Sequence, residues 1–175
     1  MPSEYEKLRA VMNQKYQIVC DAMLLTGLRP VEFERMEKSW YRAPRRCLEL
    51  PIGACLKEKC TYKERTVLLS LPGCDAVDAY LNSDFEKPGK VSMRDTLKRY
   101  AITSGIGDDG ITGKCFRKTL DSWLVACYES RYPSIAASMG HDIETILTHY
   151  LGIAFPMAET ELMKTKYLVE WGMRL

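Results

Sequence analysis

Apolar residues follow a helical period along most of the chain and a strand-like pattern only between residues 46 and 71. A helix is predicted over 3–26, where Ser3 can act as the N-cap with Glu6 three residues later, and Gly27 ends it. A short helix is expected from Pro30, because proline suits the first helical turn. Further helices are predicted over 74–82, 91–104, 113–129, 133–139, 142–150 and 157–171.

Three short stretches between these helices have the composition of strands. They are β-branched or leucine-rich and are bounded by proline or glycine, which predicts strands over 46–52, 54–58 and 65–71. The charged segment between the last two is expected to form a hairpin tip. The fold class is therefore expected to be mainly α (α+β), with a small antiparallel sheet of about three strands.

The composition excludes several classes of protein. With 175 residues, of which 46% are hydrophobic and 27% charged, the chain is long enough for one domain with a real core. It contains no apolar run of about eighteen residues and no secretory signal, so a cytoplasmic location is expected. The seven cysteines include no CxxC pair, which disfavours a structural zinc site.

The formal net charge is only +2, but the basic residues are clustered. Four clusters lie at 42–46, 57–65, 94–99 and 114–118. Each cluster alone fits a solvated surface about as well as it fits an anion site.

Arg29 stands between a helix-ending Thr-Gly-Leu and Pro30, in the sequence TGLRPVE. Glu32 follows three residues later, so its carboxylate can orient the guanidinium. A guanidinium held in this way makes paired hydrogen bonds to phosphate oxygens. The alternative is a surface ion pair that contributes little.

Lys114 and Arg117 lie three residues apart near the start of a predicted helix, for which Thr112 is the expected N-cap. Backbone N–H groups and the helix dipole favour an anion at such a position. A basic surface turn is the alternative interpretation.

The two histidines of the chain, His141 and His149, belong to one short segment, GHDIETILTHY. Tyr150 ends this segment, nine residues after His141. A single histidine is more often structural than catalytic. His141 and Tyr150 therefore become catalytic candidates only in combination with the basic residues described above.

Taken in order, TGLRPVE, KERTVLLSL, TGKCFRK and SMGHDIETILTHY resemble the catalytic domain of the tyrosine recombinases, the phage-integrase family. The resemblance runs from about residue 10 to residue 152. It implies that the catalytic set consists of Arg29, a hairpin lysine, Lys114, Arg117, His141 and Tyr150. Lys114 stands where the family usually has histidine, a variant similar to archaeal and archaeal-virus (fusellovirus-type) integrases. A viral or plasmid origin is expected from this likeness.

The identity of the hairpin lysine is open among Lys57, Lys59 and Lys63. Alignment on the family's usual strand puts the expected position at Cys60, and we choose its neighbour Lys59.

The resemblance implies site-specific DNA recombination or integration through a covalent 3′-phosphotyrosine on Tyr150. The arginines would neutralise charge on the nonbridging phosphate oxygens, and the lysine would protonate the leaving 5′-oxygen. Since the phosphotyrosine keeps the energy of the broken DNA bond, no ATP is expected. No metal ion or other cofactor is expected either, because the cationic side chains already supply the positive charge and no Asp/Glu cluster has the spacing of metal ligands. Two alternatives remain open: a type IB topoisomerase, and a non-catalytic DNA-binding regulator on the same scaffold.

The expected partner is double-stranded DNA at a specific attachment site, bound by a homo-tetramer that is a monomer or weak dimer without DNA. We expect residues 1–175 to form a single catalytic domain, with the core over 10–152 and no N-terminal DNA-clamp domain. The helical tail, residues 153–175, either packs on its own chain or, as the resemblance implies, is exchanged with a neighbouring protomer.

Overall fold

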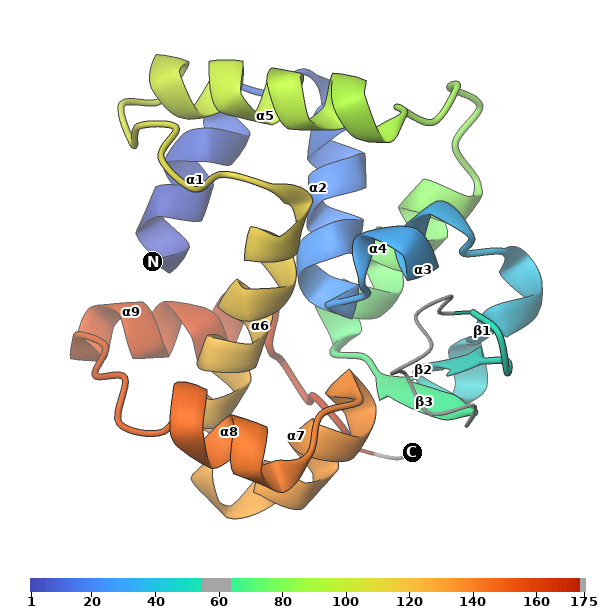
Figure 1. Cartoon of the computed structure of the whole chain (residues 1–175), viewed down its shortest axis with the longest axis vertical. Coiled ribbons are helices and arrows are strands. Elements are labelled where there is room, and N and C mark those ends of the chain that lie inside the picture. Colours follow the sequence, from blue (N-terminus) through green and yellow to red (C-terminus); the bar gives the residue numbers. More distant parts are fainter. Residues whose placement is uncertain (55–63, 174–175) are drawn as a thin grey trace.

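Helices make up most of the described chain, which is residues 1–54 and 64–173 of a computed structural model (Figure 1). The α-helices are α1 (Pro2–Ala10), α2 (Gln14–Thr26), α3 (Pro30–Glu34), α4 (Leu71–Leu81), α5 (Lys90–Thr103), α6 (Gly113–Cys127), α7 (Tyr132–Met139), α8 (Ile143–His149) and α9 (Met157–Leu162). A π-helical turn, Met163–Tyr167, continues α9. None of the helices formed by the described residues has the length and hydropathy needed to cross a lipid bilayer.

The three strands form one antiparallel sheet in the order β1 (Tyr41–Arg42), β2 (Cys47–Leu50) and β3 (Arg65–Leu68). The expected mainly helical fold with a small antiparallel sheet is therefore confirmed. β1 was not predicted, because a strand of two residues is too short to show alternation. Of the predicted strand 54–58, Ala54 lies in a bend and the remainder lies outside the described residues.

The prediction of one continuous helix over 3–26 is wrong, since the chain forms α1 and α2 with a break between them. The side-chain oxygen of Asn13 accepts a 3.1 Å hydrogen bond from the Tyr16 N–H and caps α2. Ser3 is not the N-cap of α1, because Met1 holds that position and the Ser3 hydroxyl donates to Glu159 instead. The hydrogen bonds of these polar side chains thus decide where the helices begin, even where the spacing of apolar residues predicts one continuous helix.

Three element boundaries also differ from the predictions. β2 is shorter than 46–52 and starts after Arg46, whose φ of 48° is left-handed. The strand predicted to reach residue 71 ends at Leu68, because the Ser70 hydroxyl accepts a 3.1 Å bond from the Gly73 N–H and starts α4. The helix predicted over 157–171 changes to a π-helical turn after Leu162 and ends at Tyr167.

One cluster of buried apolar side chains joins both ends of the chain. α2 packs against α4 and α6, and α5 crosses the ends of α1 and α2 at the top of Figure 1. The tail contributes Leu168 and Trp171 to this core, and the Trp171 indole donates a 3.0 Å bond to the Leu68 carbonyl. In the single chain the tail packs on its own domain, and exchange between protomers stays a prediction.

Candidate active site

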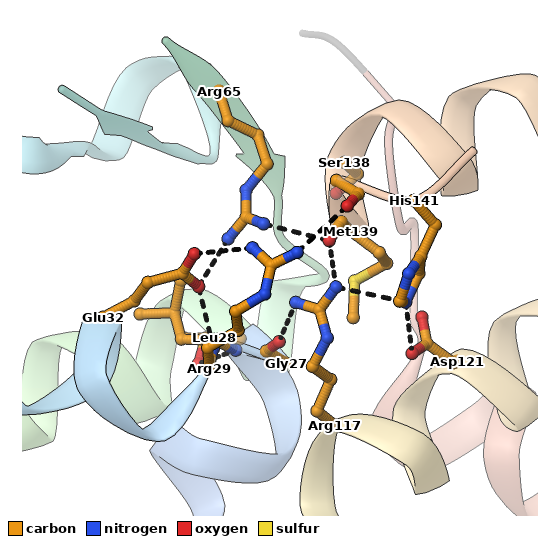
Figure 2. Close-up of polar contacts among 12 residues, drawn as sticks. Gly27, Leu28, Arg29, Glu32, Arg65, Arg117, Asp121, Ser138, Met139 and His141 are labelled. Carbon is orange, nitrogen blue, oxygen red and sulfur yellow. Dashed lines mark hydrogen bonds and ion pairs between the residues drawn. The ribbon is translucent and has the colours of Figure 1, made fainter. Parts of the chain in front are cut away.

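Three guanidiniums meet where α3, α6, α7 and the sheet come together (Figure 2). Arg29 precedes α3, Arg65 is the first residue of β3, and Arg117 lies on the second turn of α6. α2 packs on α6, and α7 packs on both β3 and α6, which brings these three distant positions to one place. The structure thus puts the predicted residues Arg29 and Arg117 side by side and adds Arg65, which was not predicted.

Backbone carbonyls at the ends of α2 and α7 hold the three guanidiniums. Hydrogen bonds run from Arg117 to the carbonyl of Gly27 (2.9 Å), from Arg29 to that of Gly140 (3.1 Å) and from Arg65 to that of Met139 (2.9 Å), which also accepts a bond from Arg117. The last carbonyls of a helix lack partners within the helix and carry the negative end of its dipole. These helix ends therefore orient cations without neutralising their charge.

Glu32 connects two of the guanidiniums from the first turn of α3. Its Oε1 accepts a 2.8 Å bond from Arg29, and its Oε2 accepts a 2.6 Å bond from Arg65. Burial alone would raise the pKa of this carboxyl, but the facing Arg65 and Arg29 hold the pKa of Glu32 below its usual value. The predicted pairing of Glu32 with Arg29 is confirmed, and Glu32 orients Arg65 as well.

Arg117 is 8% exposed and is the most buried of the three cations. Burial, together with the charges of Arg29 and Arg65, lowers the pKa of Arg117 to about 10, while Asp121 opposes this change. A buried group of like charges is stabilised by any anion that enters it. The electrostatics of the site therefore favour binding of a phosphate group.

His141 reaches this cluster from the loop after α7. Its Nε2 lies 3.0 Å from Asp121 Oδ2 and 3.1 Å from Arg117 Nη2. A protonated Nε2 donates to the carboxylate, whereas a bare Nε2 accepts from the guanidinium, so the tautomer decides which bond forms. Asp121, fully buried on α6, was not predicted from the sequence.

Tyr150 follows α8 and is half-buried beside His141, with 6.2 Å between the ring centroids. Burial and the neighbouring Asp121 carboxylate raise the pKa of Tyr150 to about 12, and Arg117 acts in the opposite direction. The phenol is therefore protonated at neutral pH and must lose a proton before or while it acts as a nucleophile.

Lys114 lies one turn before Arg117 at the exposed start of α6. The predicted N-cap is confirmed, since the Thr112 hydroxyl accepts a 3.3 Å bond from the Lys114 N–H. Among the described residues no carboxylate forms an ion pair with the Lys114 ammonium. The hairpin candidates Lys57, Lys59 and Lys63 lie outside the described residues.

Arg65 and Asp121 were not predicted as site residues, although the sequence around each of them contains a feature that could have indicated it. Arg65 is the basic residue that begins the predicted strand RTVLLSL, and Asp121 lies four residues after Arg117, on the same helix face. Within 1–54 and 64–173, no three His, Cys, Asp or Glu side chains are grouped in a way that could hold a metal ion. The residues that do converge here are three guanidiniums with Glu32, Asp121 and His141 as their neighbours.

No family model and no curated protein matches the sequence. The structure is similar to that of the integrase of transposon Tn1549, solved in complex with the DNA of the transposon's right end, with a TM-score of 0.67 at 17% sequence identity. The similarity covers 93% of this chain and 64% of the integrase chain. At this identity the similarity establishes the fold, which is the tyrosine-recombinase fold expected from the sequence motifs.

Proposed function

We propose that the chain is a site-specific DNA recombinase, or integrase, that cleaves and rejoins double-stranded DNA through a covalent 3′-phosphotyrosine on Tyr150. The observation that carries this proposal is the convergence of Arg29, Arg65 and Arg117 next to His141 and Tyr150. A cluster of guanidiniums beside the phenol of Tyr150 fits attack of that phenol on a phosphodiester. The solved integrase of similar fold holds DNA, which supports DNA as the partner.

In the proposed reaction the scissile phosphate occupies the space between the guanidiniums and Tyr150. Negative charge develops on its nonbridging oxygens during attack, and donors already fixed by Glu32 and the helix-end carbonyls stabilise that charge without reorganising. Lys114 adds a further cation at the start of α6. The leaving 5′-oxygen takes a proton from the hairpin lysine, for which Lys59 remains our choice.

The phosphotyrosine bond retains the energy of the cleaved strand, so rejoining needs no ATP. The guanidiniums supply the positive charge that a metal ion would otherwise provide. We propose a homo-tetramer on DNA, since recombination exchanges strands between two paired sites.

A nicked suicide substrate tests this proposal, because loss of a short fragment after cleavage traps the covalent adduct. The attachment site is unknown, so the substrate is a pool of nicked duplexes randomised around the nick. We expect wild-type protein to give a DNA adduct that survives denaturation, and Tyr150→Phe to give none. Sequencing the trapped DNA then identifies the preferred site.

Tyr132→Phe is the matched control, because Tyr132 is a partly buried tyrosine at the start of α7. It should form the adduct at the wild-type level. Absence of any adduct from wild-type protein that binds the same DNA would refute the proposal and leave a non-catalytic DNA-binding protein. Relaxation of supercoiled plasmid at a low ratio of protein to DNA would identify a topoisomerase instead.

A further inference from the structure

We propose that Asp121 accepts the proton of Tyr150 when the phenol attacks the DNA phosphate, an inference that rests on the function proposed above. The carboxylate would then be a catalytic residue, because it takes the proton of the nucleophile itself.

One oxygen of the Asp121 carboxylate is already fixed. Asp121 lies on the third turn of α6 with no exposed surface, and its Oδ2 is 3.0 Å from His141 Nε2. His141 therefore holds the carboxylate in one orientation, in the same way that an orienting partner holds a general base in other active sites.

The other oxygen, Oδ1, is buried and accepts no hydrogen bond from any described residue. A buried carboxylate oxygen without a partner costs free energy, because it has lost the water that solvated it. Such an atom is uncommon in a native structure and is expected where a bond forms during function.

Tyr150 is the residue whose proton this oxygen would accept. Its ring centroid lies 6.2 Å from that of His141, the residue whose Nε2 is 3.0 Å from the same carboxylate. Burial and the Asp121 carboxylate also raise the pKa of the phenol. The charged groups that face Asp121 come from three elements: Arg117 on α6, His141 after α7 and Tyr150 after α8. Arg29, Arg65 and Glu32 lie beyond Arg117 (Figure 2).

The proton balance of the step is complete. As the phenolic oxygen of Tyr150 bonds to phosphorus, its proton passes to Asp121 Oδ1, and the bond from phosphorus to the 5′-oxygen breaks. The 5′-oxygen takes a proton from the hairpin lysine. In the rejoining step the 5′-hydroxyl attacks and gives its proton back to the hairpin lysine, and Asp121 returns its proton to the departing phenolate. Aspartate accepts a hydroxyl proton in the same manner in other phosphoryl transfers.

The test measures the single-turnover rate of adduct formation against pH, between about pH 5 and pH 9, on the suicide substrate. Asp121→Asn keeps the size of the side chain and an oxygen for His141 but cannot accept the proton. We expect this variant to be about 100-fold slower than wild type or worse, which is the usual contribution of a general base. Its rate should rise about tenfold per pH unit, because the phenolate must now form before attack.

Asp142→Asn is the matched control. Asp142 is an exposed carboxylate next to His141, and its side chain does not cap α8. This variant should keep the wild-type rate and the wild-type pH profile, which excludes a general effect of removing one negative charge near the site. Thermal melting and DNA binding of both variants establish that they are folded.

Three results would overturn the inference while leaving the proposed function intact. Asp121→Asn could cleave at the wild-type rate, or it could cleave slowly with an unchanged pH profile, which would indicate a positioning role only. If Asp121→Asn does not fold, the dependence of the wild-type cleavage rate on pH tests the inference instead. A rate that does not follow the protonation of an imidazole fits a carboxylate acceptor, whereas a rate that does follow it would assign the role to His141. Absence of adduct from wild type would instead contradict the proposed function itself.

Discussion

At the scale of single residues, the arrangement of the cations depends on Glu32. This carboxylate is 1% exposed and is the acidic group bonded to both Arg29 and Arg65. A buried ion pair contributes little relative to an apolar replacement, but removing one partner leaves an uncompensated charge. Loss of Glu32 would leave two guanidiniums next to the buried Arg117.

We therefore expect Glu32→Gln to lower the free energy of unfolding by about 3 kcal/mol at pH 7. The pKa of Glu32 is lower in the folded protein than its usual 4.5, so the unfolded chain binds the proton more tightly. The stabilisation is complete above about pH 5 and is lost as pH falls through the folded pKa. The difference between wild type and variant, measured by urea unfolding, should therefore shrink in acid.

Glu86→Gln serves as the control, since Glu86 is exposed and forms no ion pair among the described residues. It should change the free energy of unfolding by no more than about 0.5 kcal/mol at either pH. Equal stability of Glu32→Gln and wild type at pH 7 would show that the cations do not need this carboxylate.

At the scale of elements, the C-terminal segment is part of the core of its own chain. Leu168 and Trp171 are almost completely buried, and the Ser70 hydroxyl that caps α4 donates a 2.7 Å bond to the Tyr167 carbonyl. Deletion of residues 157–175 would remove these core contacts, so lost assembly in such a deletion would not identify a protomer contact. Point substitutions separate the two roles.

Trp171→Ala should lower the free energy of unfolding by about 3–5 kcal/mol, because it removes the buried indole and leaves a cavity in the core. Met157→Ala, at the start of α9, should leave the free energy of unfolding unchanged, because Met157 is 86% exposed. Urea denaturation of both variants measures the contrast. A stable Trp171→Ala protein would mean that the tail is not needed by its own domain and would favour exchange between protomers.

At the scale of the whole molecule, a net charge of +2 gives little general attraction to DNA. The proposed DNA binding would then depend on a few cations in fixed places, and each phosphate contact would release condensed counterions. Lys114 is exposed at the start of α6, one turn before Arg117, and we expect it to be one of these cations.

Lys114→Gln should weaken DNA binding and reduce the slope of log affinity against log salt concentration by about one. Lys164→Gln, on the π-helical turn after α9, removes an equally exposed lysine and should leave that slope unchanged. Fluorescence anisotropy with labelled duplex at several salt concentrations measures both slopes. If the two variants have the same slope, Lys114 does not contact a phosphate.

Local patterns in the sequence were sufficient for most of the helices, the fold class and the pairing of Arg29 with Glu32. These features depend on residues that are close in the chain, where period, capping and a three-residue spacing have direct geometric meaning. The same patterns failed at Asn13 and Ser70, where a polar side chain starts a helix in the middle of an apolar period.

The chain order of the motifs was enough to single out Arg29, Lys114, Arg117, His141 and Tyr150 as candidates. Arg65 and Asp121 became visible only when β3, α6 and α7 were packed together, because their partners are distant in the chain. In the sequence, an arginine at the start of a strand and an aspartate inside a helix have the pattern of surface residues, and only the folded structure shows that they are shielded from water. Packing decides which charged groups meet in the interior. For this reason the folded molecule, and not the order of its residues, added Arg65 and Asp121 to the candidate site.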